Sequence, residues 1–180
     1  MNESPILSRP YDTAHLPVTG AELEIDASDG QRAALANAYD LLAVEKLVAT
    51  ATLTPAGAGG VTVEGRVVAD IVQACVVSLE PVAQHIDEPF SVRFAPQGSA
   101  AVRNSAAREI AIDPEAPDPP ELMDGTTVDV GALAEEMFVL AIDPYPRAPG
   151  ADLPLEPEQQ PESAEESPFA VLRQVVPRPK

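Results

Sequence analysis

The alternation of residues 61–79 constrains the fold more than any other feature of this 180-residue chain. Nearly all odd-numbered residues in this run are apolar, whereas the even-numbered ones begin polar and become more apolar after Val68. Successive side chains of a strand point to opposite faces of a sheet, so the pattern predicts a long strand with one buried face. Cys75, the only cysteine, falls on that face. The chain is therefore expected to fold around a sheet that contains this strand.

Two further runs predict the neighbouring strands. Residues 41–54 and 86–94 show the same alternation and are rich in β-branched or aromatic residues. The Gly-rich residues 55–60 predict a hairpin loop before the long strand, and residues 81–83 predict the turn after it. Together the three strands predict an antiparallel β-meander, which is the smallest sheet with a plausible hydrophobic face of its own.

Two segments predict helices that cover this sheet. Ser28 and Gln31 have capping-box spacing, which indicates a helix over residues 29–38. Asp129 is a suitable N-cap for a second helix over residues 130–142. The expected fold class is therefore α+β. The apolar stripe expected on the second helix consists of Leu133, Met137, Leu140 and Ala141.

Composition divides the chain into three parts. Residues 1–20 are polar and are expected to be extended, and residues 21–143 are expected to form a single α+β domain. Many of the 20 prolines fall in residues 144–180, which predicts an extended Pro-rich tail ending in a short amphipathic segment. Within the domain, residues 113–125 contain four prolines and five acidic residues and are expected to form an exposed acidic loop.

The end of the long strand resembles a motif of the YceD family. Residues 75–81 read Cys-Val-Val-Ser-Leu-Glu-Pro, and the family pattern is Cys-x-Arg-Cys-Leu-Glu-Pro, so Val77 and Ser78 replace an arginine and a cysteine. Residues 143–147 and 168–172 are similar to two further elements of the family, in the same order. The resemblance implies a ribosome biogenesis factor that supports accumulation of large-subunit (23S) ribosomal RNA.

The charge of the chain bears on its partners. Acidic residues outnumber basic ones by 29 to 11, which gives a net charge of −18. Nonspecific affinity for nucleic acid depends on Lys and Arg, so this balance disfavours RNA as the main partner. An acidic surface serves either solubility alone or the attraction of a cationic partner. Because ribosomal proteins are strongly basic, the resemblance favours a basic ribosomal protein or large-subunit assembly factor.

Two alternatives stay open at this point. Direct contact with RNA would be favoured if four arginines gathered on one face: Arg66, Arg93, Arg103 and Arg108. A generic acidic protein-interaction module, unrelated to the ribosome, is the alternative function.

The candidate partner-binding residues are Glu80, Pro81, Tyr145, Arg147, Phe169 and Leu172. The first two end the family motif. Tyr145 and Arg147 are an aromatic residue and an arginine of the kind that anchors interfaces. Phe169 and Leu172 share one face of the C-terminal amphipathic segment. That segment either folds back onto the domain or docks as a helix in a partner's groove.

No pattern in the sequence indicates catalysis or a cofactor. A structural zinc site needs four ligands, whereas this chain offers Cys75, His15 and His85, with Ser78 in place of a second cysteine. Cys75 is expected on a buried strand face, where a thiol is unreactive. We therefore expect no enzyme, metal or cofactor. A hydrolase or transferase with an unrecognised site is the remaining alternative.

The sequence also bears on location. The N-terminus lacks the apolar run of a secretory signal, and no apolar stretch approaches the roughly 20 residues of a membrane span. We expect a cytoplasmic protein with no membrane partner.

Overall fold

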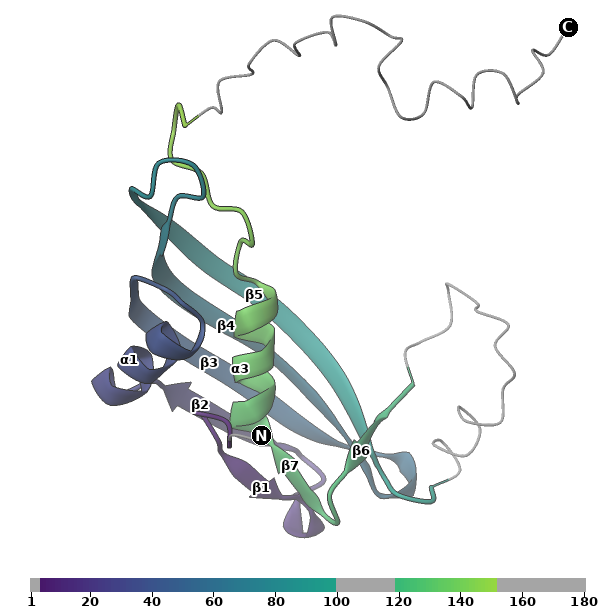
Figure 1. Ribbon diagram of the computed structural model, residues 1–180. Helices are drawn as coiled ribbons and strands as arrows, with labels where there is room; N and C mark the ends of the chain where they lie inside the picture. Colours follow the sequence, from purple (N-terminus) through teal and green to yellow (C-terminus); the bar gives the residue numbers. More distant parts are fainter. Residues whose placement is uncertain (1–3, 100–118, 152–180) are drawn as a thin grey trace, which may run out of the picture.

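The computed structural model describes residues 4–99 and 119–151. In this part of the chain two helices lie on one face of a five-stranded sheet, which confirms the α+β class (Figure 1). The sheet has the order β2-β3-β4-β5-β6, formed by Ala21–Asp26, Ala43–Ala56, Gly60–Ala74, Pro81–Pro96 and Glu121–Met123. The helices are α1, Asp29–Ala38, and α3, Val130–Leu140. The remaining elements are β1 (Pro10–Asp12), β7 (Thr127–Asp129), η1 (Thr13–His15) and η2 (Gly57–Gly59).

The sheet is mixed rather than purely antiparallel. Strands β2 to β5 pair with their neighbours antiparallel, but β6 runs parallel to β5, with Phe94 opposite Glu121. Part of the segment expected as an acidic loop therefore forms a strand, and residues 113–118 of that expected loop lie outside the described residues. Strand β6 covers an edge of β5 whose backbone groups would otherwise lack partners, and it buries Met123.

The alternation in the long strand is confirmed over β4. Val63, Val67 and Ile71 are buried on the face toward the helices, and the register places the buried Ile86 of β5 opposite Ala69. The strand ends at Ala74, however, so its expected extension to residue 79 was wrong. The turn expected at residues 81–83 was also wrong, because Pro81 already begins β5.

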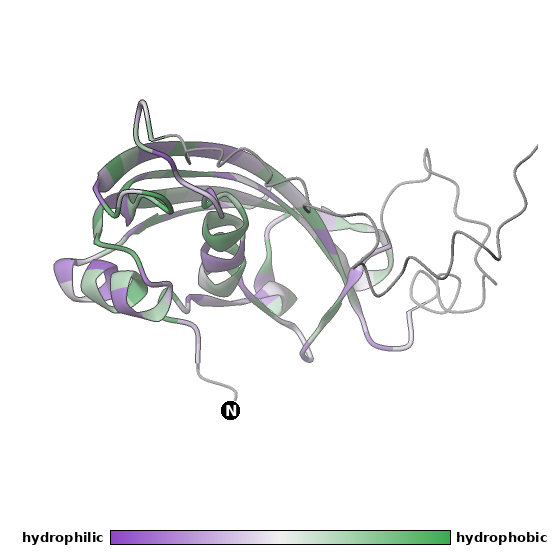
Figure 2. Cartoon of the chain, turned by 45° about the horizontal axis from the view of Figure 1, so that its top comes forward, coloured by the Kyte–Doolittle hydropathy of each residue, from purple (hydrophilic) through white to green (hydrophobic). Residues whose placement is uncertain are grey.

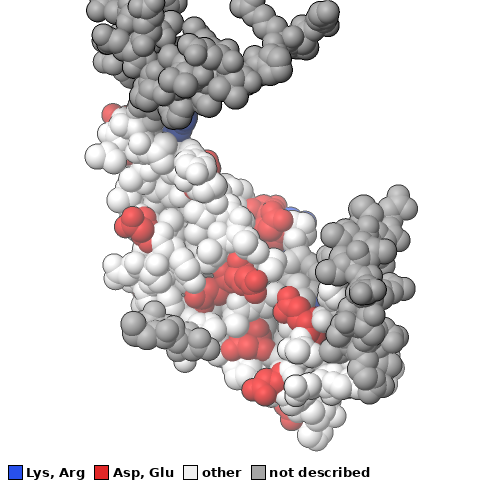
Figure 3. All heavy atoms as spheres, turned by 45° about the vertical axis from the view of Figure 1, so that its right-hand side comes forward, with Lys and Arg blue, Asp and Glu red and all other residues white. Residues whose placement is uncertain are grey.

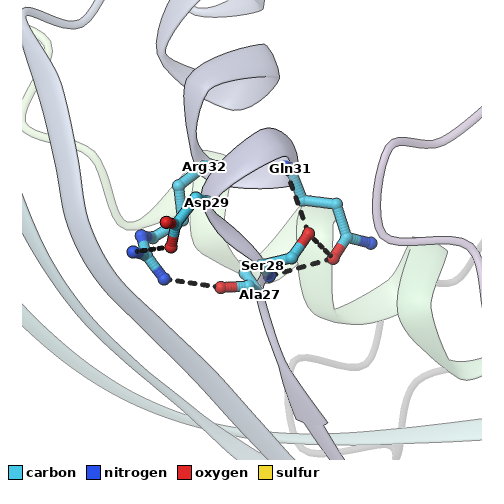
Figure 4. A network of polar contacts seen from close by, with 5 residues as sticks. All are labelled: Ala27, Ser28, Asp29, Gln31 and Arg32. Atoms are coloured by element: carbon cyan, nitrogen blue, oxygen red, sulfur yellow. Dashed lines mark hydrogen bonds and ion pairs between the residues drawn. The ribbon is translucent and has the colours of Figure 1, made fainter.

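Helix α1 begins where the capping-box spacing predicted. Gln31 N–H donates to the Ser28 hydroxyl at 3.4 Å, and Ser28 N–H donates to the Gln31 side chain at 3.1 Å (Figure 4). Arg32 bonds the Ala27 carbonyl at 2.7 Å and the Asp29 carboxylate at 2.7 Å, which ties the first turn to the end of β2. The cap thus satisfies backbone donors that an α-helix leaves unpaired at its start.

Helix α3 begins at the predicted cap but buries a different face. Asp129 accepts a bond from Ala132 N–H at 2.9 Å. The buried side chains include Leu133 and Phe138, whereas Leu140 is 72% exposed, so the expected stripe was only partly right. The stripe shifts because α3 packs against the sheet on one side and against the N-terminal segment on another. Figure 2 shows α3 lying inside the concave curve of the sheet.

The N-terminal segment is built into the core. Leu7 is completely buried, although its surroundings in the sequence are polar. Strand β1 pairs antiparallel with β7, and Val130 N–H donates to the Arg9 carbonyl at 3.1 Å. Gly131 makes this approach possible, since a Cβ atom there would lie 1.8 Å from the Leu7 carbonyl oxygen. Residues 7–9 therefore pack directly against the start of α3.

A buried carboxylate completes this junction. Glu135 is 6% exposed and accepts bonds from Leu7 N–H at 2.9 Å and from the Tyr39 hydroxyl at 2.8 Å. Tyr39 also packs edge-on against Phe138, with ring centroids 6.4 Å apart. Residues from the N-terminus, the end of α1 and the middle of α3 thus meet in one network. Within the described residues, no helix has the length and apolar character needed to cross a membrane.

Candidate functional site

Two distant segments form one end of the molecule, which we call the tip: residues 75–81 and residues 143–148. Val76 N–H donates to the Pro146 carbonyl at 2.9 Å, and Ala148 N–H donates to Cys75 Sγ at 3.3 Å. Figure 1 shows the two segments together beyond the ends of β4 and β5. The structure thereby brings Glu80 and Pro81 to the same end as Tyr145 and Arg147. Whether these residues bind a partner stays a prediction.

Two glutamines fix the chain as it leaves α3. Gln73 of β4 donates to the Asp143 carbonyl at 2.9 Å. Gln84 of β5 donates to the Ala141 carbonyl at 2.9 Å and accepts from Asp143 N–H at 3.1 Å. Sequence reasoning missed both residues, although Gln73 is the polar exception on an otherwise apolar strand face. These bonds hold the chain at Ala141 and Asp143 against β4 and β5.

Cys75 is buried as expected, but it lies in a turn rather than on a strand. Its sulfur accepts backbone N–H bonds from Ala148 at 3.3 Å, Ser78 at 3.4 Å and Val77 at 3.5 Å. The bond from Ala148, followed by those from Ser78, lowers the pKa of the thiol to about 6 because each favours the thiolate. The sulfur of Cys75 thus serves as an acceptor that joins the two segments of the tip.

The outer surface of the tip includes three exposed apolar side chains beside polar and charged ones. Leu79 is 76% exposed, Tyr145 is 73% exposed and Val76 is 48% exposed, and Arg147 is exposed beside them. Leu79 also has a left-handed backbone, with φ of 62°, which is uncommon for a residue with a bulky side chain. Exposed aromatic and aliphatic side chains beside an arginine are typical of protein interfaces.

The residues of the tip do not fit a metal site. Cys75 is the only thiol in the chain, and Ser78 stands where a second cysteine would be needed. Within residues 4–99 and 119–151, no group of three or more His, Cys, Asp or Glu side chains could hold a metal ion.

A second candidate surface lies beside α3 and consists of four acidic residues, which we call the acidic groove: Glu121, Asp124, Asp129 and Glu136. These residues line a depression of about 400 Å³ between β6, β7 and α3. Acidic side chains are spread over this side of the molecule in Figure 3. Within the described chain, Glu121, Asp124 and Glu136 form no ion pair with Lys or Arg. Among the described residues, the groove therefore presents negative charge without a balancing cation.

The carboxylates of the groove differ in their surroundings. Desolvation raises the pKa of Glu121, and the nearby charge of Glu136 raises it further. Desolvation also acts to raise the pKa of Asp129, but the bonds that it accepts from Ser8, Arg9 and Ala132 outweigh this and lower it. The carboxylate of Asp129 is therefore engaged by hydrogen bonds within the fold, whereas Glu121 and Glu136 are exposed.

Of the four arginines considered for RNA contact, Arg66 of β4 and Arg93 of β5 lie on the same face of the sheet by register. Arg66 pairs with Asp87 on the outer face of the sheet, and His85 lies 2.6 Å from Asp70 on the same face. Among the other candidates, Arg103, Arg108, Phe169 and Leu172 lie outside the described residues.

Comparison with known proteins identifies the family. The sequence model of the family described as Large ribosomal RNA subunit accumulation protein YceD matches residues 63–175, well over half of the chain. No curated protein and no solved structure matches. The matched residues contain both segments of the tip and all four residues of the acidic groove. This chain therefore belongs to the YceD family, whose name implies a role in the accumulation of large-subunit ribosomal RNA.

Proposed function

We propose that this protein supports accumulation of large-subunit ribosomal RNA by binding a basic ribosomal protein or assembly factor at the acidic groove. The observation that carries the proposal is the pair Glu121 and Glu136, which lie close enough for one carboxylate to raise the pKa of the other. Two such groups without a balancing cation repel each other, and a Lys or Arg side chain placed between them would relieve the repulsion.

The tip offers the same partner a different kind of contact. Leu79 and Tyr145 are exposed apolar side chains that hydrogen-bonded backbone holds in place. Electrostatic attraction raises association rates and selects cationic partners, whereas buried aromatic anchors supply most of the affinity of an interface. The proposed partner is therefore a protein with a basic segment and an apolar patch. We propose that the two proteins meet in the cytosol, and that this protein acts by binding and without catalysis.

RNA is the less favoured partner because the described arginines are few and partly neutralised. Arg66 is paired with Asp87, and the overall charge of −18 repels phosphates.

The proposal is tested by affinity purification of the full-length tagged protein. We expect recovery of large-subunit components in low salt and their loss as salt rises, because screening weakens contacts between exposed charges. The double variant Glu121→Gln/Glu136→Gln should reduce recovery about tenfold, since each lost charge contact contributes up to ~1 kcal/mol.

The matched control is Glu22→Gln/Glu24→Gln, which removes the same charge from β2. This control should recover nearly as much as the unaltered protein. Equal losses in both variants would show that total charge matters rather than the groove. Recovery of no ribosomal component at any salt concentration, together with normal large-subunit RNA in cells lacking the gene, would instead favour a generic acidic interaction module.

A further inference from the structure

A depression lies between the two helices, and we call it the helix groove. It measures about 890 Å³ and is lined by the end of α1, one side of α3 and the N-terminal residues 4–6. This volume lies within the roughly 300–1,000 Å³ of pockets that enclose a ligand of several side chains. The groove is separate from the tip, and it shares only Ala132 and Glu136 with the lining of the acidic groove.

The lining of the helix groove is mostly apolar. Ile6, Val139 and Leu140 contribute aliphatic side chains, and Leu140 is 72% exposed. None of the described lining residues is Lys or Arg, whereas the lining includes the exposed Glu136 and the buried Glu135. An occupant should therefore bring bulky apolar side chains and a positive charge.

We propose that the helix groove is the docking site for the chain's own C-terminal segment, residues 168–176. Phe169, Leu172 and Val176 recur at helical spacing and form one apolar face. Arg173 follows directly after Leu172, so the segment carries a positive charge that complements the negative charge of Glu136 in the groove. The intervening tail is acidic, so the docking segment is the part of the tail with a matching charge.

The length of the chain permits this contact. The described residues end at Ala151, and Phe169 follows 18 residues later. An extended chain covers about 3.3 Å per residue, so this stretch reaches roughly 60 Å. A domain of this size has a radius of gyration of about 14 Å, and the segment can therefore reach the groove from any exit point on the surface. Tethering also raises the effective concentration of the segment above that of a separate protein.

The test places a photoreactive benzophenone amino acid at position 169 of the full-length protein. After irradiation of an equal mixture of ¹⁴N- and ¹⁵N-labelled chains, we expect crosslinks to peptides containing residues 34–39 or 132–140, within chains of a single label. Crosslinks that join chains of different label would instead identify a second copy as the occupant. The proposal would be overturned by crosslinks between chains of different label, by crosslinks to other parts of the domain, or by the absence of crosslinks.

Two variants sharpen this test. Leu140→Glu places a charge in the apolar lining and should lower the yield about tenfold, because burying a leucine side chain favours association by more than 1.4 kcal/mol. Leu79→Glu is the matched control, since Leu79 is equally exposed but lies at the tip. Its yield should be unchanged, and an equal loss in both variants would contradict docking in the helix groove.

Discussion

The two ends of α3 differ in how far the side chains around them are buried. At its start, Leu7 is completely buried and the carboxylates of Asp129 and Glu135 each accept bonds from the N-terminal segment. At its other end, the chain runs into the tip, where the backbone is hydrogen-bonded but Leu79 and Tyr145 remain about three-quarters exposed.

This difference separates stability from function. The hydrogen bonds of the N-terminal segment to Asp129 and Glu135 join parts of the chain 120 and 128 residues apart, so their loss should affect the whole fold. The exposed side chains of the tip contribute little to folding, since they bury little surface. They are therefore available for binding, and the following variants test this division from the largest expected effect on stability to the smallest.

The largest effect should come from Gly131→Ala. The new Cβ atom would lie 1.8 Å from the Leu7 carbonyl oxygen and 2.7 Å from Arg9 N, so the N-terminal segment must move. Overpacking of this kind should lower the free energy of unfolding by at least about 2 kcal/mol, as measured by urea denaturation.

Gly30→Ala is a closely matched control for this variant. Gly30 and Gly131 each occupy the second residue of a helix with a capped start, but no atom lies within 4 Å of a Cβ at position 30. The control should be neutral or stabilising by up to ~1 kcal/mol, because alanine favours helix more than glycine does. Equal destabilisation of both variants would mean that Leu7 does not pack tightly on α3.

An intermediate effect on stability should come from removing the Tyr39 hydroxyl, and this effect should depend on pH. Desolvation and the bond to Glu135 raise the pKa of the Tyr39 hydroxyl from 10.0 to about 12. The folded state therefore retains a proton that the unfolded state loses. Stability from this group is complete below pH 10 and is lost as the pH rises from 10 to about 12.

Tyr39→Phe isolates this contribution. The variant should be less stable than the unaltered protein by about 1.5 kcal/mol at pH 9, since it loses one hydrogen bond to a charged group. The difference should shrink as the pH rises from 10 to 12. Urea titrations of both proteins at several pH values measure it, and a difference that stays constant would rule out the raised pKa.

The smallest effect on stability should come from the tip. The double variant Leu79→Ala/Tyr145→Ala alters side chains that are 76% and 73% exposed. The free energy of unfolding should therefore change by less than about 0.5 kcal/mol per site. Recovery of ribosomal partners should nevertheless fall several-fold, because exposed aromatic anchors contribute strongly to interfaces.

Val18→Ala serves as the control for the tip variant, since Val18 is 95% exposed and lies outside the tip. It should leave both stability and recovery unchanged. A tip variant that unfolds readily, or that recovers partners as well as this control does, would remove the distinction between the two ends of α3.

Features with a local cause could be predicted from the sequence. The capping box at Ser28 and Gln31, the bounds of α1 and the buried face of β4 all follow from the spacing of nearby residues. Glu121 and Asp124 belonged to the expected acidic loop, but their meeting with Glu136 was missed, because Glu121 and Glu136 lie 15 residues apart on separate elements. Leu7 was missed for the same reason, since its partner Glu135 lies 128 residues away.

The residues of the tip were predicted from the sequence, but the turn that residues 75–80 form was not. The family motif singled out residues 75–81 and 143–147, but the alternation of Val77 and Leu79 suggested that the strand continued. Instead, Cys75 N–H donates to the Glu80 carbonyl at 2.8 Å, and its sulfur receives Ala148 N–H from the other segment. A pattern of apolar residues cannot distinguish a strand end from a turn when a distant segment supplies the hydrogen bonds.

The sequence by itself determined the α+β class, the two helix starts, the buried face of the longest strand and the family. Periodicity and capping depend on residues within a few positions of one another, so they can be read without the fold. Only the tertiary structure decided which side of α3 is buried, that the N-terminus enters the core, and that two acidic side chains meet beside β6. Those outcomes depend on contacts between distant segments, where packing and desolvation rather than local preference set the free energy.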